Sequence, residues 1–182
     1  VVPQIASIGE SDLALLAHCF LPLIGAGEAE FGGEILPGAE AMRRAGIQAP
    51  AFGPKDGLAL VSANSGSIGP GVLALEDARR VLDALAAAMA LSLEGFRGNP
   101  SPFDARLQKL RPAPGQEAAA AQLRALLAGS LLNQPTGEAG GPRRVQDPLS
   151  FRCFASVQGA ALFAAEQAEL ALSRELGGAG DN

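Results

Sequence analysis

The chain is poor in the residues on which many functional sites depend. It has no tryptophan, no tyrosine and a single histidine, His18. Stacking platforms for bases or sugars therefore have only phenylalanine to draw on. The two cysteines, Cys19 and Cys153, lie far apart and form no CxxC pair. The sequence accordingly predicts no metal site.

Positive charge is also scarce. Lysine and arginine number 14 against 19 aspartates and glutamates, a formal net charge of −5. The chain lacks the basic surface that neutralises phosphates, so nucleic acid is not an expected partner. Hydrophobic residues at 48% and charged residues at 18% exclude a disordered, charge-rich chain. At 182 residues, the length suits one domain or a piece of a larger one.

Long hydrophobic runs are missing as well. The run from Ala84 to Leu93, interrupted only by Ser92, is far below the roughly 18 residues needed to cross a bilayer. The run from Leu13 to Ala26 contains a histidine and a proline. Both are predicted to be buried helical segments, and no membrane partner is expected. Nothing at the N-terminus resembles a signal peptide, so the expected location is cytoplasmic.

One helical stripe dominates the pattern that is present. Its members recur at steps of three and four residues, with a final step of seven, and a cluster of Gly69, Pro70 and Gly71 marks the predicted start of the helix. Opposite charges spaced i,i+4 occupy the other face. A narrow stripe is typical of helices packed lengthwise in a bundle. The stripe consists of Leu75, Ala78, Leu82, Leu85, Met89 and Phe96.

Two further helices are predicted, over residues 116–132 and 154–176, because each segment is rich in alanine and leucine. Residues 133–144 have the glycine and proline content of a loop. The first sixty residues are broken by glycine and proline and predict short helices and irregular turns. The expected fold class is all-α, an elongated antiparallel helix bundle. We divide it into residues 1–68, short helices and loops, and residues 69–182, long bundle helices with a loop at 133–152.

Generic motif searches favour structural interpretations. Gly25-Ala26-Gly27 begins a GxGxxG pattern, but position 30 is glutamate, so a tight turn after a helix is expected. Ser11 lacks the second glycine of a GxSxG elbow. His18 lies in an apolar helical segment and is interpreted as a hydrogen-bonded core residue.

Six blocks along the chain resemble the histidine and phenylalanine ammonia-lyases, in the order of that family. In that order, Ala6–His18 (ASIGESDLALLAH) is similar to GSVGASGDLAPLAH, Lys55–Leu60 (KDGLAL) to KEGLAL, Ala90–Gly98 (ALSLEGFRG) to ALSLEALRG, Pro102–Arg106 (PFDAR) to PFDxR, Arg111–Gln116 (RPAPGQ) to RPHPGQ and Val145–Cys153 (VQDPLSFRC) to VQDPYSLRC. The blocks span essentially the whole chain, which is identified as a member of the family.

This resemblance implies an almost all-helical subunit of a homotetramer, with active sites built from several chains. Members eliminate ammonia from histidine, phenylalanine or tyrosine. They use no external cofactor: an Ala-Ser-Gly tripeptide cyclises into a methylidene-imidazolone electrophile, which requires an unhindered glycine nitrogen. Family chains are well over twice as long and include a tyrosine base. We therefore expect this chain to be a fragment, a split gene product or a truncated paralogue.

At the electrophile the chain departs from the family. Glu10-Ser11 stands where Ala-Ser-Gly is expected, so Ser11 is the candidate catalytic residue but the glycine is missing. If Glu10-Ser11-Asp12 is taken as the tripeptide instead, the attacking nitrogen belongs to a residue with a Cβ. Either alignment predicts an uncyclised backbone.

The resemblance also assigns substrate-binding positions. The family asparagine beside the electrophile falls on Ser62, with Asn64 two residues on as a substitute, and the family tyrosine of the QDPYS block falls on Leu149. Gln146 and Arg152 match, and Arg152 is the position that pairs with the substrate carboxylate. A structural alternative is that Arg152 caps a helix or pairs with Asp147.

Three functional hypotheses follow. The chain is an ammonia-lyase-family protein of impaired activity, a non-catalytic descendant that serves as a binding or assembly module, or an enzyme completed by another chain. A small amino-acid ligand is compatible with all three hypotheses. The apolar helix stripes predict association with further copies of the chain.

Overall fold

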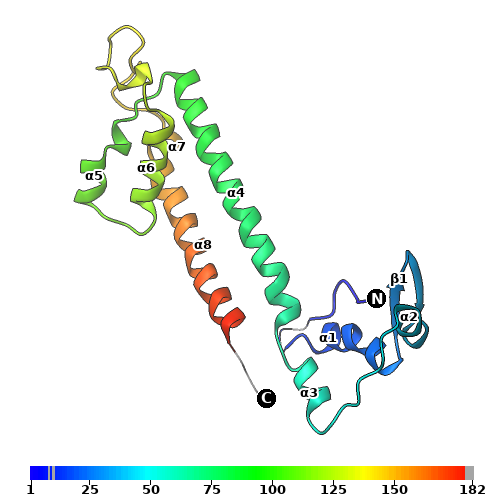
Figure 1. Ribbon diagram of the computed structural model, residues 1–182. Helices are drawn as coiled ribbons and strands as arrows, with labels where there is room; N and C mark the ends of the chain where they lie inside the picture. Colours follow the sequence, from blue (N-terminus) through cyan, green and yellow to red (C-terminus); the bar gives the residue numbers. More distant parts are fainter. Residues whose placement is uncertain (8, 10, 179–182) are drawn as a thin grey trace. The chain divides into compact units, whose positions relative to one another are not determined.

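The computed structural model describes residues 1–7, 9 and 11–178. The chain divides into two compact units (Figure 1). Unit 1 comprises Val1–Val72 and Leu172–Asn182, and unit 2 comprises Leu73–Ala171. The long helix α4 (Ser65–Phe96) contributes residues to both. The all-α prediction is confirmed in the main, with one small sheet added.

Unit 1 consists of short elements, as the glycine and proline pattern predicts. They are α1 (Leu13–Phe20), the 3-10 helix η1 (Leu21–Ile24), β1 (Glu28–Phe31), β2 (Glu34–Pro37), α2 (Gly38–Ala45) and α3 (Asp56–Val61). The antiparallel hairpin of β1 and β2 pairs Glu28 with Pro37 and was not predicted, because each strand has only 4 residues. Its turn, Gly32-Gly33, has φ of 63° and 84°, which glycine adopts at little steric cost. Gly25, also at positive φ, ends η1, so the tight-turn interpretation is confirmed.

The long helix begins four residues earlier than predicted. α4 starts at Ser65, so that Pro70 lies inside it rather than before it. The backbone N–H groups of Ser67 and Ile68 donate to the carbonyl of Asn64 at 3.1 and 2.9 Å. The Asp12 carboxylate also accepts from the Ser67 N–H. Asp12, which is distant in sequence, thus stabilises a first turn that the local sequence does not predict.

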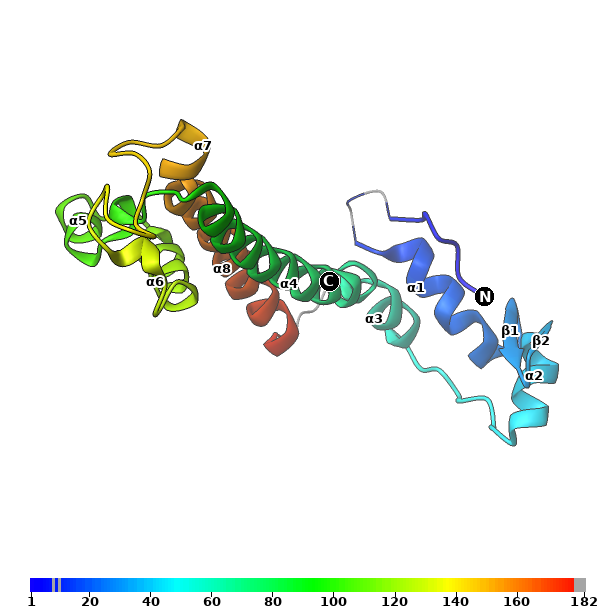
Figure 2. The ribbon, with the colours of Figure 1, turned by 90° about the horizontal axis from the view of Figure 1, so that it is seen from above.

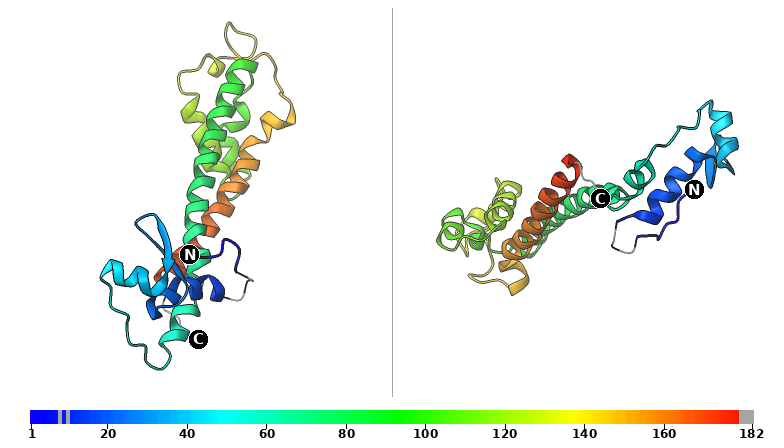
Figure 3. Two further views of the ribbon diagram at one scale, coloured as in Figure 1. Left: turned by 90° about the vertical axis from the view of Figure 1, so that its right-hand side faces the viewer. Right: turned by 90° about the horizontal axis from the view of Figure 1, so that it is seen from below.

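Unit 2 is a helical bundle, visible from several directions in Figures 1 to 3. Besides α4 it contains η2 (Ser101–Phe103), α5 (Ala105–Leu110), α6 (Gln116–Leu126), η3 (Leu131–Asn133), α7 (Leu149–Arg152) and most of α8 (Phe154–Gly177). The prediction for α8 is confirmed to within one residue. The prediction for α6 is too long: regular helix ends at Leu126, and Gly129 follows at a φ of 79°.

The core of unit 2 lies where α4, α6 and α8 meet, and its largest fully buried members are Leu93, Phe103, Leu123 and Leu132. Two glycines permit the close approach of α8 to the start of α6. A Cβ on Gly159 would lie 2.6 Å from the backbone nitrogen of Gln116, and one on Gly115 would lie 2.1 Å from the carbonyl oxygen of Gly159. Only glycine fits this contact.

The buried face of α4 differs from the predicted stripe. Ala86, Ala90 and Leu93 are buried, whereas Leu85, a predicted stripe member, is 47% exposed. Two of the three buried residues are alanines, because small side chains let α6 and α8 approach α4 closely. Large apolar residues stay exposed on α4, among them Val81 and Leu91. The prediction that residues 84–93 are buried throughout is therefore wrong for this chain alone.

The charged face of α4 is partly as expected. Arg80 pairs with Glu76 at 3.2 Å, as the i,i+4 spacing predicts. Arg79 instead pairs with Glu169 on α8, and Asp83 accepts a hydrogen bond from Gln122. The helical stretch Asp56–Phe96 has a window of mean hydropathy 1.4 and meets the length and composition of a membrane-crossing helix. Core helices of soluble proteins pass the same test, and these ion pairs fit a helix between protein neighbours.

Candidate functional site

The predicted site residues fall into two groups on separate units. Ser11, Ser62 and Asn64 belong to unit 1, and Gln146 and Arg152 belong to unit 2. Within each unit the structure brings the group together. Glu10, the other half of the altered tripeptide, lies outside the described residues.

In unit 1 the backbone joins Ser11 to the segment that carries Ser62 and Asn64. The N–H of Asp12 donates to the carbonyl of Ala63 at 2.9 Å, so residue 11 lies directly beside residues 62–64. Ser11 itself has a φ of 56°, the left-handed region that favours glycine. The chain thus makes a glycine-like turn here with a serine.

A buried carboxylate holds this arrangement. Asp12 is 1% exposed, and it accepts hydrogen bonds from the N–H of Ser67 at 2.7 Å and from the Ser67 hydroxyl at 2.6 Å. These hydrogen bonds, chiefly the one from the Ser67 hydroxyl, lower the pKa of Asp12 below its ordinary value. The charge also lies at the N-terminal end of α4, where the helix dipole favours an anion. No role of the Asp12 side chain was predicted from the sequence. The available signal was its position in the block that resembles the family's electrophile motif.

Ser62 and Asn64 line one cavity of about 680 Å³ in unit 1. Ile68 of α4 and Arg174 near the end of α8 also line it. The backbone carbonyl of Asn64 accepts from the first turn of α4, which fixes the position of that residue. Hydroxyl, carboxamide and guanidinium groups here can hold a polar ligand.

One backbone contact bears on the methylidene-imidazolone group. Cyclisation through Glu10-Ser11-Asp12 would require the Asp12 nitrogen to attack a carbonyl two residues earlier. That nitrogen donates instead to Ala63, and the Asp12 side chain is held by Ser67. Cyclisation would cost the hydrogen bond from the Asp12 nitrogen to Ala63, and we derive no reaction step through this group.

In unit 2, Gln146 and Arg152 line one cavity of about 590 Å³. Asn99, Asp147 and Cys153 line it as well. The Nε of Arg152 is buried and has no hydrogen-bond partner within the described part of the chain. An arginine that lines a cavity, and whose Nε is not engaged by these residues, suits a carboxylate ligand.

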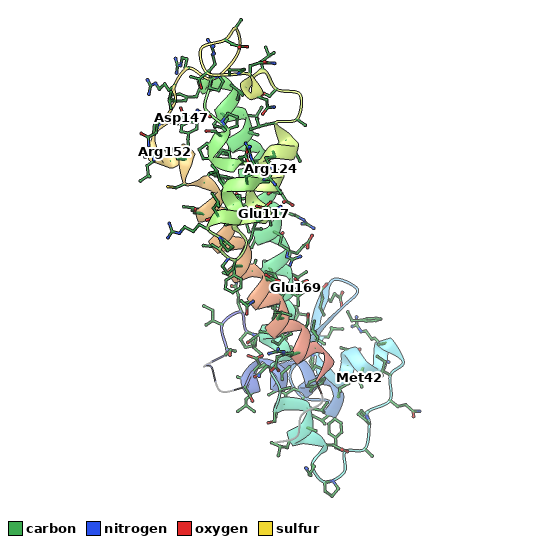
Figure 4. The ribbon with its side chains drawn as sticks, turned by 90° about the vertical axis from the view of Figure 1, so that its left-hand side faces the viewer. Met42, Glu117, Arg124, Asp147, Arg152 and Glu169 are labelled. Carbon is green, nitrogen blue, oxygen red and sulfur yellow. The ribbon has the colours of Figure 1, made fainter. Side chains whose placement is uncertain are left out.

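The structural alternative for Arg152 finds little support. Asp147 is 5% exposed, and its Oδ2 accepts from the backbone N–H of Asn99. Its Oδ1, like Arg152 Nε, has no hydrogen-bond partner among residues 1–7, 9 and 11–178. The two side chains lie near each other beside α7 in Figure 4, yet neither of these two atoms has the other as a partner. Leu149, in place of the family tyrosine, is 63% exposed.

Two other sequence interpretations are tested here. His18 is exposed on α1, so its interpretation as a core histidine is wrong for this chain, because α1 buries only Leu16. Within the described ranges no group of three or more His, Cys, Asp or Glu side chains could hold a metal ion. Asn99 was missed altogether, since it stands between two recognised blocks.

Comparisons with known proteins agree with this arrangement. The family model for aromatic amino acid lyases matches residues 1–182. A histidine ammonia-lyase of Anaeromyxobacter sp. (strain K) is 46% identical over the whole chain, which covers 37% of that protein. Ergothionase of Treponema denticola, solved with desmethyl-ergothioneine sulfonic acid, has a TM-score of 0.86 at 34% identity, with 100% of this chain and 36% of that one covered.

A second solved relative is the phenylalanine aminomutase of Pantoea agglomerans, with a TM-score of 0.86 and 28% identity over the whole chain, which covers 37% of it. The chain thus spans little more than a third of the length of the relatives it matches. Because the family model matches the whole chain, the chain belongs to the aromatic amino acid lyase family.

Proposed function

We propose that this chain belongs to a protein that binds histidine or an aromatic amino acid, with Arg152 and Gln146 holding the carboxylate end. The observation that carries this proposal is that Arg152 and Gln146 line one cavity, while no acceptor within the described part of the chain engages the Arg152 Nε. A planar guanidinium binds a carboxylate through two parallel hydrogen bonds. The relatives at 42–46% identity are histidine ammonia-lyases, which supports the ammonia-lyase substrate class.

Elimination of ammonia is the activity of these relatives, and we propose that it is impaired in this chain. The support is the missing glycine after Ser11 and the hydrogen bond that engages the Asp12 nitrogen. Leu149 supplies no proton donor where the family has a tyrosine. Without an electrophile, an amine leaving group has no covalent activation. We therefore propose an uncyclised backbone at residues 9–12.

The second candidate is a non-catalytic member of the family that serves as a binding or assembly module. The exposed apolar residues of α4 and α8, such as Leu91 and Val157, favour assembly, and we propose that they contact further copies of the chain.

Calorimetric titration with L-histidine and L-phenylalanine, run beside an ammonia-release assay, tests the proposal. Binding without turnover is expected. Arg152→Gln removes the bidentate contact, and because a hydrogen bond to a charged group is worth about 1.5–3 kcal/mol, it should weaken binding about 10-fold to 100-fold. Arg80→Gln, at an exposed arginine on α4 that lines neither cavity described above, is the matched control and should bind normally.

Intact mass decides the state of the backbone. The proposal requires the full mass calculated from the sequence. A mass lower by two waters, together with turnover that disappears in Ser11→Ala, would show that the tripeptide cyclises and would overturn the impaired-activity proposal. Absence of amino-acid binding would leave the assembly module as the better candidate.

A further inference from the structure

Asn99 makes an unusual set of contacts for a residue outside the recognised motifs. It is 9% exposed and lies between the end of α4 and η2. Its Nδ2 donates to the carbonyls of Arg144 at 3.2 Å and Val145 at 2.9 Å. Its Oδ1 accepts from the N–H of Ser101 at 3.0 Å. The whole carboxamide is therefore used.

The backbone of Asn99 makes the complementary contact. Its N–H donates to the carboxylate of Asp147, which is itself buried. The residue before Gln146, Val145, is held through its carbonyl, and the residue after it is held through its side chain. Gln146 is thus fixed on both sides by the same residue.

Neighbouring contacts strengthen this anchor. A Cβ on Gly98 would lie 3.1 Å from Asp147 Oδ2 and 2.6 Å from Leu93, so the backbone before Asn99 approaches Asp147 closely. The backbone N–H of Arg143 donates to the carbonyl of Arg97 at 3.0 Å. Phe96 stacks on Phe151 of α7 with ring centroids 4.8 Å apart. The loop 143–147 and α7 are therefore joined to the end of α4.

We propose that Asn99 is a positioning residue for ligand binding: it sets the orientation of Gln146 toward the cavity that Arg152 lines. This inference rests on the proposed function, because it assigns Gln146 to the ligand. Without the Asn99 carboxamide, two carbonyls lose their donor and the loop gains freedom on one side of Gln146. Asp147, bound only to the backbone N–H, retains its contact in side-chain variants.

The test compares Asn99→Ala and Asn99→Asp with Gln158→Ala in the 182-residue chain. Asn99→Asp keeps the acceptor for Ser101 but loses both donors. Gln158 is the matched control: it is 1% exposed, donates to the carbonyl of Leu82 at 3.1 Å and belongs to α8 away from the loop. Thermal unfolding measures how much stability each variant loses, so that the effects of variants with equal losses can be compared.

The first measurement needs no ligand. Hydrogen exchange of the peptide covering residues 143–149 should rise roughly fivefold or more in both Asn99 variants, the factor expected when about one hydrogen bond is lost, and should stay at the wild-type rate in Gln158→Ala. Unchanged exchange in the Asn99 variants would overturn the positioning role, whether or not the chain binds an amino acid.

The second measurement is calorimetric titration with L-histidine and L-phenylalanine. The Kd of whichever amino acid binds should rise roughly 5-fold to 30-fold in both Asn99 variants and stay unchanged in Gln158→Ala. An equal rise in Gln158→Ala would show a general effect of stability and overturn the inference. If the wild-type chain binds neither amino acid, the proposed function fails, and with it the link to the ligand, while the exchange result still decides whether Asn99 orders the loop.

Discussion

Asp12 and Ser67 are joined by two hydrogen bonds, from the N–H and the hydroxyl of Ser67 to the two oxygens of one buried carboxylate. These residues lie 55 positions apart in the sequence. Through this contact the turn that contains Ser11 is attached to the first turn of the longest helix. The loop where the family places its electrophile is thus ordered here by a side chain that does no chemistry.

Replacing Asp12 should destabilise unit 1. Asp12→Ala removes the charged acceptor of two hydrogen bonds, each worth about 1.5–3 kcal/mol, and leaves the Ser67 donors to be satisfied otherwise. We expect a loss of at least about 2 kcal/mol in the free energy of unfolding, measured by urea denaturation. Asp77→Ala, at an exposed carboxylate on α4, is the control and should change stability by less than about 0.5 kcal/mol. Equal effects would contradict the role given to Asp12.

Alanine substitutions at two glycines should change stability in opposite directions, because only one of them lies at the contact between α6 and α8. Gly159→Ala places a Cβ 2.6 Å from the backbone of Gln116 and should cost about 1–3 kcal/mol or more, because backbone must shift. Gly95→Ala, inside α4 with nothing within 4 Å of its added Cβ, should stabilise by about 0.4–1 kcal/mol. Thermal and denaturant unfolding measure both. A neutral Gly159→Ala would show that the helices separate more readily than this contact implies.

The ion pairs of α2 predict an acidic titration. Glu40 accepts hydrogen bonds from Arg43 at 2.8 and 2.7 Å and from Arg44 at 2.9 Å, which together, Arg43 foremost, lower the pKa of Glu40 from 4.5 to about 2. A lowered pKa stabilises the fold above the unfolded value of 4.5, and this stabilisation is lost as the pH falls from there toward about 2. Carbon NMR of the carboxyl should give a midpoint near 2 in the wild type. In the double variant Arg43→Gln, Arg44→Gln the midpoint should return toward 4.5, and 1 M salt should raise it in the wild type only.

The exposed apolar face of α4 predicts self-association. Leu73, Val81 and Leu91 are 65–73% exposed, and burying such residues between copies is favourable by roughly 25 cal/mol per Å². Light scattering on the purified chain should show an oligomer. Val81→Lys and Leu91→Lys should shift it toward monomer, whereas Glu138→Lys, at an exposed loop position away from α4 in sequence, should leave the mass unchanged. A monodisperse wild-type monomer that binds no apolar dye would contradict this prediction.

Much of the fold and of the site could be predicted from the sequence. The helix over residues 154–177 follows from local alanine and leucine content. Arg152 and Gln146 were identified through the block that resembles the family motif, and the structure places both on one cavity. The start of α4 could not be predicted from the sequence, because the residue that stabilises it, Asp12, is distant in sequence. His18 was misjudged because an apolar neighbourhood in sequence says nothing about whether a neighbour in space covers it.

By itself, the sequence determined the family, the all-helical class and the residue types at each site position, including the missing glycine after Ser11. The tertiary structure alone decided that the Asp12 nitrogen donates to Ala63 and that Asn99 holds both sides of Gln146. It also decided that the buried face of α4 consists of Ala86, Ala90 and Leu93. Motifs and periodicity depend on neighbours along the chain. Hydrogen bonds across 40 to 55 positions and the choice of buried face depend on how closely helices can approach, which only packing fixes.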